Sequence, residues 1–326
     1  MTTAARGKPI KPIPKARKHR RFTLDDLDLS ILSLPTAIWY LAFCYVPMFG
    51  VVMAFKNYKV KMGRGFLYSL FVNSQWVGLK NFQFLFKGRD AFLMFRNTIG
   101  YNLIFIALGV LIPVTLAILI SQMYSQRLAK VCQTSMFLPH FLSWVVVSYF
   151  VFAFLSMDKG LVNNAIRAAG GESVNFYQST RLWTYLIVFL QVWKTMGYGM
   201  VVYLASISGI DGALYEAALI DGASKWQQVR FITLPLLRPI ISIMFILAIG
   251  NIFRADFGLF YQATRNAGAL ADVTTTIDVY VFKILIERSN VNYSSSAGFL
   301  QSAFGLVTIL AANLTVKRID PEAGLF

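Results

Sequence analysis

The sequence predicts an all-α membrane protein with six transmembrane helices. Three observations lead to this prediction: an unusually apolar composition, six long runs almost free of charge, and no alternation of polar and apolar residues within those runs. Of the 326 residues, 56% are hydrophobic and 14% are charged, whereas soluble domains carry about 25% charged residues. Lipid is therefore expected to solvate part of the chain.

Each apolar run is long enough to cross a hydrocarbon layer about 30 Å thick as a helix. Because unpaired backbone groups are costly in lipid, a span is either a helix or a strand of a closed barrel, and barrel strands alternate. The runs in this sequence do not alternate. The transmembrane domain is predicted at residues 31–316, with spans at about 31–55, 99–120, 136–157, 182–210, 239–262 and 296–316.

The formal charge of +16 favours anionic lipid headgroups or an acidic ligand as partners. Nucleic acid is disfavoured, because the apolar fraction is high and no recognition motif is present. Six spans place both termini on one side, and the basic residues before the first span favour the cytoplasm. Segment 56–98, expected outside, is also basic, so charge counting alone does not fix the orientation.

The ends and the first long loop are interpreted from composition. Residues 1–30 are predicted as a basic cytoplasmic tail whose last part, Leu24–Leu29, starts an interfacial helix, and residues 317–326 as a short cytoplasmic tail. The apolar run after Ser30 is too long for the core of a signal peptide. Segment 56–98 is too polar to span, and its aromatic clusters predict a sub-domain at the outer interface.

The polar loop 211–238 between the fourth and fifth spans is the most informative segment. Glu216–Leu219 favours a helix, and Asp221-Gly222 predicts a break between two short helices, because glycine accepts unusual backbone angles. Pro235 is expected to break the second helix, and Pro239 to open the next span. A β-hairpin at Asp-Gly is excluded by the helical flanks, whereas a plain connector is the simpler alternative.

The pattern E-A-A-x-x-D-G-A followed by L-P-x-x-x-P resembles the cytoplasmic coupling loop of binding-protein-dependent ABC importer permeases. Its fixed positions are all present: Glu216, Ala217, Ala218, Asp221, Gly222, Ala223, Leu234, Pro235 and Pro239. The resemblance implies a type I ABC importer permease fold in which this loop forms a coupling helix seated on an ATPase subunit. It also implies that the loop and both termini face the cytoplasm, in the bacterial cytoplasmic (inner) membrane.

Further segments extend the resemblance to sugar permeases. Val77–Phe82 is similar to the external segment after their first span, and Phe137–Trp144 to the start of their third. Asp256–Gln262 resembles a subgroup for oligosaccharides and polysaccharides that includes bacterial alginate importers. The resemblance implies a heterodimer of two related permeases, two ATP-binding subunits that hold ATP and Mg, a periplasmic or extracellular solute-binding protein, and a carbohydrate substrate.

Polar and aromatic residues in the fourth and fifth spans are candidates for the substrate pathway: Lys194, Tyr198, Asn251, Arg254, Asp256 and Phe257. A charge at the centre of a span costs about 2.5–3.5 kcal/mol on insertion scales, so Lys194 should face protein or a wet cavity. A pathway role and a structural role, paired or snorkelling, both stay open for Lys194. A guanidinium or amide face would suit the hydroxyls of a sugar or the carboxylate of a uronate.

No catalytic, metal or cofactor site is expected in this chain. The sequence lacks a phosphate-binding G-x-x-x-x-G-K-[ST] loop, an H-E-x-x-H pair and a Cys/His cluster, and its two cysteines form no disulfide framework. The alternatives are a secondary transporter driven by an ion gradient, a membrane-bound enzyme and a purely structural subunit. A secondary transporter would favour repeated halves and paired midplane acids, which the sequence does not show.

Overall fold

The computed structural model describes residues 24–86 and 89–319. The chain divides into two units, with the boundary between Gly50 and Val51. The described part of the first unit is a run of helical turns: α1 (Leu24–Tyr40), η1 (Leu41–Tyr45) and α2 (Val46–Met48), followed by η2 (Phe49–Phe55). Helix α1 thus begins inside the predicted tail 1–30. The basic stretch 1–21 lies outside the described residues.

The described residues contain five helices long and apolar enough to cross a membrane. They are Leu27–Phe55, Arg89–Ser121, Thr180–Ser208, Lys225–Gly250 and Val291–Arg318. A sixth span is reached if one bent pair, Gln126–Phe141 and Trp144–Leu155, counts as a single span. The predicted third span, 136–157, is therefore not one helix, because the chain turns by 100° within it.

The segment after the first span forms a small polar sub-domain. It contains β1 (Lys56–Asn57) paired antiparallel with β2 (Gln75–Trp76), and the helical turns α3 (Phe66–Tyr68), η3 (Ser69–Asn73) and η4 (Gly78–Phe86). Asn81 lies inside the Val77–Phe82 motif, is buried, and donates to the carbonyls of Ala54 and Lys56 at 3.0 and 2.8 Å. The motif therefore holds this sub-domain together.

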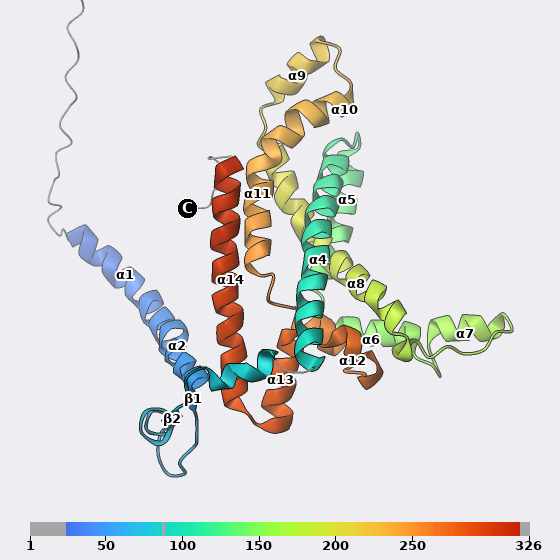
Figure 1. Ribbon diagram of the computed structural model, residues 1–326. Helices are drawn as coiled ribbons and strands as arrows, with labels where there is room; N and C mark the ends of the chain where they lie inside the picture. The colour runs from blue at the N-terminus through green and yellow to red at the C-terminus, as the bar shows by residue number, and fades with distance from the viewer. Residues whose placement is uncertain (1–23, 87–88, 320–326) are drawn as a thin grey trace, which may run out of the picture. The chain divides into compact units, whose positions relative to one another are not determined.

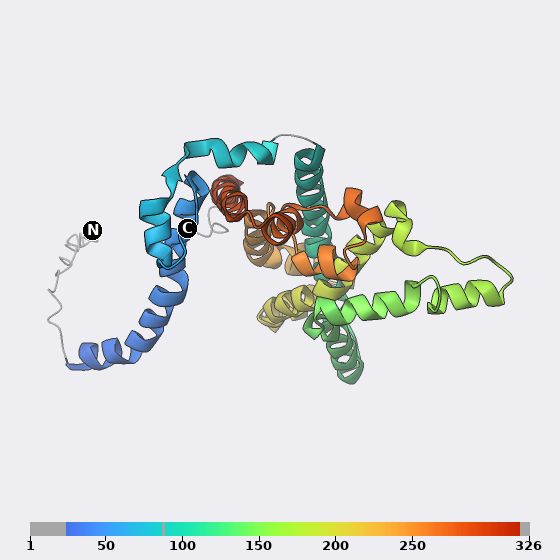
Figure 2. The same ribbon diagram turned by 90° about the horizontal axis from the view of Figure 1, so that it is seen from below.

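The centre of the second unit is the pair α4 (Arg89–Ser121) and α8 (Thr180–Ser208), which pack along each other (Figure 1). Gly199 permits the close approach, because a Cβ there would lie 3.0 Å from the ring of Pro113. Around them run α5 (Gln126–Phe137), η5 (Leu138–Phe141), α6 (Trp144–Leu155), α7 (Leu161–Ala168) and η6 (Phe176–Gln178). Figures 1 and 2 both show α6 and α7 extending sideways from this pair.

The last third of the chain completes the helix bundle. Its elements are α9 (Gly212–Ile220), α10 (Lys225–Gln228), η7 (Val229–Thr233), α11 (Leu234–Gly250), η8 (Gly258–Ala263), η9 (Gly268–Leu270), α12 (Ala271–Thr274), α13 (Ile277–Arg288) and α14 (Val291–Ile319). Helices α9 and α10 lie at one end of the bundle, and β1, β2, α12 and α13 at the opposite end (Figure 1).

The predicted boundaries of the fifth span, 239–262, are wrong at both ends. The helix is continuous from Lys225 to Gly250, so Pro235 does not break it and Pro239 lies inside it. Arg254 and Asp256 follow the helix in an irregular stretch instead of lying on its faces. The other predicted spans, 99–120, 182–210 and 296–316, fall within or close to α4, α8 and α14.

Candidate functional site

The tip formed by α9 and α10 is built by local hydrogen bonds that the motif encodes. Helix α9 ends in a Schellman motif: the N–H of Ala223 donates to the carbonyl of Ala218 at 2.8 Å, and the N–H of Gly222 to that of Leu219 at 3.1 Å. This ending needs a left-handed residue at Gly222, where φ is +76°. The predicted break at Asp221-Gly222 between two helices is confirmed.

Caps and one side-chain contact stiffen the same tip. The carboxylate of Asp211 accepts from the N–H of Ala213 at 3.0 Å at the start of α9. Ser224 and Gln227 form a capping box at the start of α10. The hydroxyl groups of Tyr215 and Thr233, 2.9 Å apart, join α9 to η7. The tip is therefore an ordered element.

The tip presents apolar and small side chains to its surroundings. No residue of α9 is buried, and the exposed large apolar side chains of the tip are Leu214, Leu219, Ile220, Trp226 and Phe231. Among the motif residues, Glu216, Ala217, Asp221, Gly222 and Pro239 are exposed, and Ala218, Ala223, Leu234 and Pro235 are half-buried. Such a surface is typical of an interaction site.

The tip is continuous with the fifth span. Helix α10 passes into α11 through the π-helical turn Val229–Thr233, in which the N–H of Leu234 bonds to the carbonyl of Val229. Pro235 follows as the second residue of α11. A π turn re-pairs backbone groups around a residue that lacks an N–H, so the helix tolerates the proline. One helix of 26 residues thus runs from the tip to Gly250.

The irregular stretch after α11 is held by polar side chains from three other helices. The amide of Asn102 on α4 donates to the carbonyls of Ile252 and Arg254, each at 2.9 Å. Gln301 on α14 donates to the carbonyl of Phe253 at 2.9 Å, and Asp278 on α13 accepts from the N–H of Ala255 at 2.7 Å. Non-helical backbone is tolerated among membrane helices only when its groups are paired in this way.

A cavity of about 270 Å³, here called the polar cavity for the four polar side chains in its otherwise apolar wall, lies between the end of α11, this stretch and α14. Its polar lining side chains are Asn251, Arg254, Gln301 and Ser302. Burial raises the pKa of the neighbouring Asp278 carboxyl, while its hydrogen bonds from Ala255 and Gln301 and the charge of Arg254 act in the opposite direction. The cavity can offer a guanidinium, amides and a hydroxyl to a polar ligand.

The remaining predicted pathway residues gather around the bend between α5 and α6. The ammonium group of Lys194 donates to the carbonyl of His140 at 3.0 Å, and the ring of Tyr198 stacks on His140 with centroids 4.9 Å apart. Asp256 accepts from the indole of Trp144 at 2.6 Å. Phe257 stacks on Tyr261 at 4.8 Å. The six candidates therefore form two groups, of which only Asn251 and Arg254 line the polar cavity.

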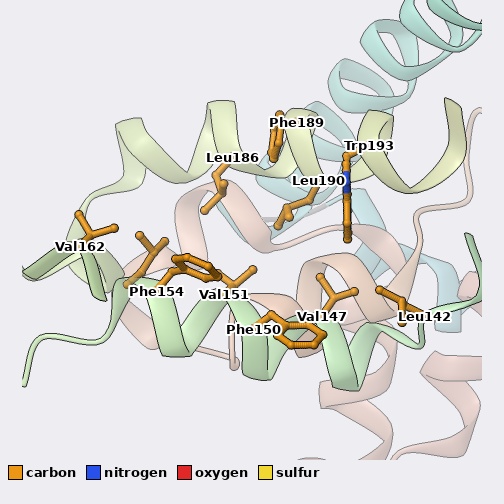
Figure 3. A pocket seen from close by; sticks show the side chains of 11 residues that line it. Leu142, Val147, Phe150, Val151, Phe154, Val162, Leu186, Phe189, Leu190 and Trp193 are labelled. Carbon is orange, nitrogen blue, oxygen red and sulfur yellow. The ribbon is translucent and has the colours of Figure 1, made fainter. Parts of the chain in front are cut away.

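A larger cavity, of about 480 Å³, lies between α6 and α8 (Figure 3). Leu186, Phe189, Leu190 and Trp193 of α8 face Val147, Phe150, Val151 and Phe154 of α6 in that view. All of its lining residues are aliphatic or aromatic. A sugar needs placed polar partners, so of these two cavities the polar cavity is the better candidate for a hydrophilic solute.

Sequence reasoning missed Asn102, Asp278 and Gln301. Asn102 and Gln301 stand in runs predicted as spans, and a lone amide in an apolar helix is the signal that could have identified them. Asp278 lies outside the predicted spans and carried no such signal. No group of three or more His, Cys, Asp or Glu residues that could hold a metal occurs within residues 24–86 and 89–319.

The chain is similar to known permeases over most of its length. It is 33% identical over 311 residues to the polygalacturonan/rhamnogalacturonan transport system permease protein YteP of Bacillus subtilis (strain 168), covering 94% of each chain. It is 32% identical over 302 residues to Protein LplB of the same organism, covering 92% of each.

A solved structure shares the fold. The crystal structure of a bacterial ABC transporter involved in the import of the acidic polysaccharide alginate matches with a TM-score of 0.80 and 31% identity, over 91% of this chain and 97% of that chain. This match confirms the predicted all-α, type I permease fold. The family model described as "Binding-protein-dependent transport system inner membrane component" matches residues 109–321. The chain therefore belongs to this family of membrane-spanning permeases.

Proposed function

We propose that this chain is the transmembrane permease subunit of an ATP-driven importer that moves an oligosaccharide or polysaccharide, acidic and alginate-like, into the cytoplasm. The observation that carries the proposal is the ordered, exposed tip at α9 and α10, which one continuous helix joins to the region of a polar cavity. An ATPase subunit bound to the tip would move the cavity wall through this helix. The similarity to carbohydrate permeases supports this function.

The tip is the surface that a partner ATPase would hold. Exposed apolar side chains such as Ile220 and Trp226, 88% and 68% exposed, need a partner surface to cover them. The small residues Ala217 and Ala218 and the exposed Glu216 leave a shallow surface for close approach. On this proposal, closure of the ATPase pair displaces α9 and α10, and α11 moves with them because no break separates it from α10.

The polar cavity is the part of the pathway that would select the solute. Guanidinium groups bind carboxylates through paired, charge-assisted hydrogen bonds, and Arg254 stands there beside Asn251, Gln301 and Ser302. These groups suit a uronate, which carries one carboxylate and several hydroxyls. Relatives named for polygalacturonan and for alginate support an acidic sugar.

The assembly follows from the same proposal. A second, related permease subunit would complete the membrane channel as a heterodimer, and two ATP-binding subunits would hold ATP and Mg, so this chain needs no cofactor and is not an enzyme by itself. A solute-binding protein would deliver the sugar, as the alginate transporter solved with its pentasaccharide-bound periplasmic protein suggests. With the tip on the cytoplasmic side of the inner membrane, both termini are cytoplasmic.

The test is uptake by the complete complex in liposomes, with an oligogalacturonate and a neutral glucose oligosaccharide of equal length as solutes. We expect uptake of the oligogalacturonate that requires ATP and the solute-binding protein and persists when an uncoupler removes ion gradients. Uptake that survives ATP depletion and collapses with the uncoupler would instead favour a secondary transporter. Equal uptake of both sugars would leave the ATP-driven mechanism and remove the acidic preference.

A further inference from the structure

The bend between η5 and α6 is stabilised by a hydrogen bond from a charged side chain. Lys194 of α8 donates to the carbonyl of His140, in the last turn before the chain turns by 100°. That carbonyl belongs to the C-terminal end of a helical segment, which carries partial negative charge and unpaired acceptors. The ammonium group satisfies one of these acceptors. Lys194 therefore has a defined structural partner at the bend.

Trp144, the first residue of α6, joins Lys194 to a second break in the chain. The ammonium group of Lys194 lies over the Trp144 ring, 5.4 Å from a centroid, which is a cation–π geometry. The indole N–H of Trp144 donates to Oδ2 of Asp256 at 2.6 Å. Gly258 packs directly on the ring, because a Cβ there would clash with it. One indole thus contacts a cation through its face and an anion through its edge.

Asp256 in turn organises the chain after α11. Its other carboxylate oxygen, Oδ1, accepts from the N–H groups of Gly258 and Leu259 at 2.9 and 3.4 Å, at the start of η8. Within the described residues, a salt bridge joins Arg89 to Asp272, and none joins Lys194 to Asp256. The link between the two charges therefore runs through Trp144.

We propose that Trp144 is a positioning residue for transport, which with Lys194 and Asp256 locks the bend before α6 to the break after α11. The three residues form one unit, here called the Trp144 lock. Helix α11 is continuous with α10 and ends six residues before Asp256. A displacement of the tip therefore reaches the lock through one continuous helix and one short non-helical stretch, residues 251–255. Those residues are themselves held by Asn102, Asp278 and Gln301. Movement of α11 is thereby passed to α6.

This inference rests on the proposed function, because it takes the tip as the point where ATP acts. Its test therefore measures the movement of α11 and the movement of α6 separately in the complete complex. The sequence has two cysteines, Cys44 and Cys132, whose replacement by serine gives a background for paired spin labels. One label pair joins α11 to α4, at Leu236→Cys and Leu111→Cys; the other joins α6 to α4, at Phe154→Cys and Leu111→Cys. All three positions are exposed.

Distances are compared without nucleotide and with ATP plus vanadate. In the otherwise unmodified chain both pairs should shift. In Trp144→Phe, which keeps a ring and loses the donor, the α11 pair should shift as before and the α6 shift should be lost. Asp256→Asn, which keeps an acceptor for the indole, should retain the α6 shift, whereas Asp256→Leu should lose it. Trp39→Phe, on α1, is the matched control and should leave both shifts unchanged.

The outcomes separate the two proposals. An undiminished α6 shift in both Trp144→Phe and Asp256→Leu overturns the Trp144 lock and leaves the proposed function intact. If neither label pair shifts in the unmodified chain, ATP does not act through the tip, and both that part of the proposed function and the Trp144 lock are refuted. The retained α11 shift serves as the folding control, because a variant that had lost its structure would not respond at either position.

Discussion

The amide of Ala223 donates to the carbonyl of Ala218 at 2.8 Å, and the turn that allows this bond passes through a left-handed Gly222. This hydrogen bond closes α9 and sets the direction in which α10 departs. The E-A-A-x-x-D-G-A pattern thus has a backbone explanation: a helix, a glycine that ends it, and a small residue whose N–H bonds back to the helix.

Gly222→Ala should weaken the tip through backbone strain. A side chain at φ +76° costs about 1–2 kcal/mol, whereas space is not limiting, since nothing lies within 4 Å of a Cβ there. We expect slower transport at unchanged expression, measured as ATP-dependent uptake in liposomes. Gly212→Ala is the matched control, because Gly212 is equally uncrowded and lacks a positive φ. Equal losses in both variants would contradict a role for the left-handed turn.

Glu216→Arg should uncouple ATP hydrolysis from transport. Glu216 is exposed on α9, so reversing its charge alters the surface proposed to contact the ATPase and leaves the fold of this chain in place. Uptake should fall about tenfold or more while basal ATPase activity of the complex persists, and the bulky Gly222→Trp should act in the same way. Glu216→Gln, without the opposite charge, should have the smaller effect. Full transport in Glu216→Arg would argue against contact between this face and an ATPase.

Arg254→Gln should reduce transport of an acidic sugar selectively. A hydrogen bond to a charged group contributes about 1.5–3 kcal/mol, so uptake of an oligogalacturonate at low concentration should fall about tenfold to a hundredfold. Uptake of a neutral oligosaccharide, if carried, should change little. Arg181→Gln, an exposed arginine at the start of α8, provides the control. Equal reduction for both sugars would show that Arg254 acts on structure and not on the carboxylate.

Asn102→Leu should destabilise the break after α11. The Asn102 amide bonds to the non-helical carbonyls of Ile252 and Arg254, and a carbonyl left unpaired away from water costs about 1–3 kcal/mol. The thermal unfolding midpoint of the purified complex should fall. Thr115→Val on the same helix is the control, because the Thr115 hydroxyl bonds only within its own helix, to the carbonyl of Leu111. An unchanged midpoint in Asn102→Leu would mean that other groups hold the break.

Local features were predictable from the sequence, and long-range ones were not. The turn at Asp221-Gly222 depends on neighbouring residues and was found where expected. The bend near His140 depends on Lys194, 54 residues away, and the end of α11 depends on Asn102, Asp278 and Gln301 on three other helices. Hydropathy does not detect such partners. The prediction that Pro235 breaks the helix was wrong because the π turn before it re-pairs the backbone.

The most direct measurement is photo-crosslinking from the tip. A benzoylphenylalanine replaces Ile220, which is 88% exposed, or, as control, Met62, which is 95% exposed in the segment between β1 and α3. In membranes containing the whole complex, the probe at position 220 should attach to an ATP-binding subunit, and the probe at 62 should not. Attachment from position 220 to the solute-binding protein, or to no subunit at all, would contradict a cytoplasmic tip held by an ATPase.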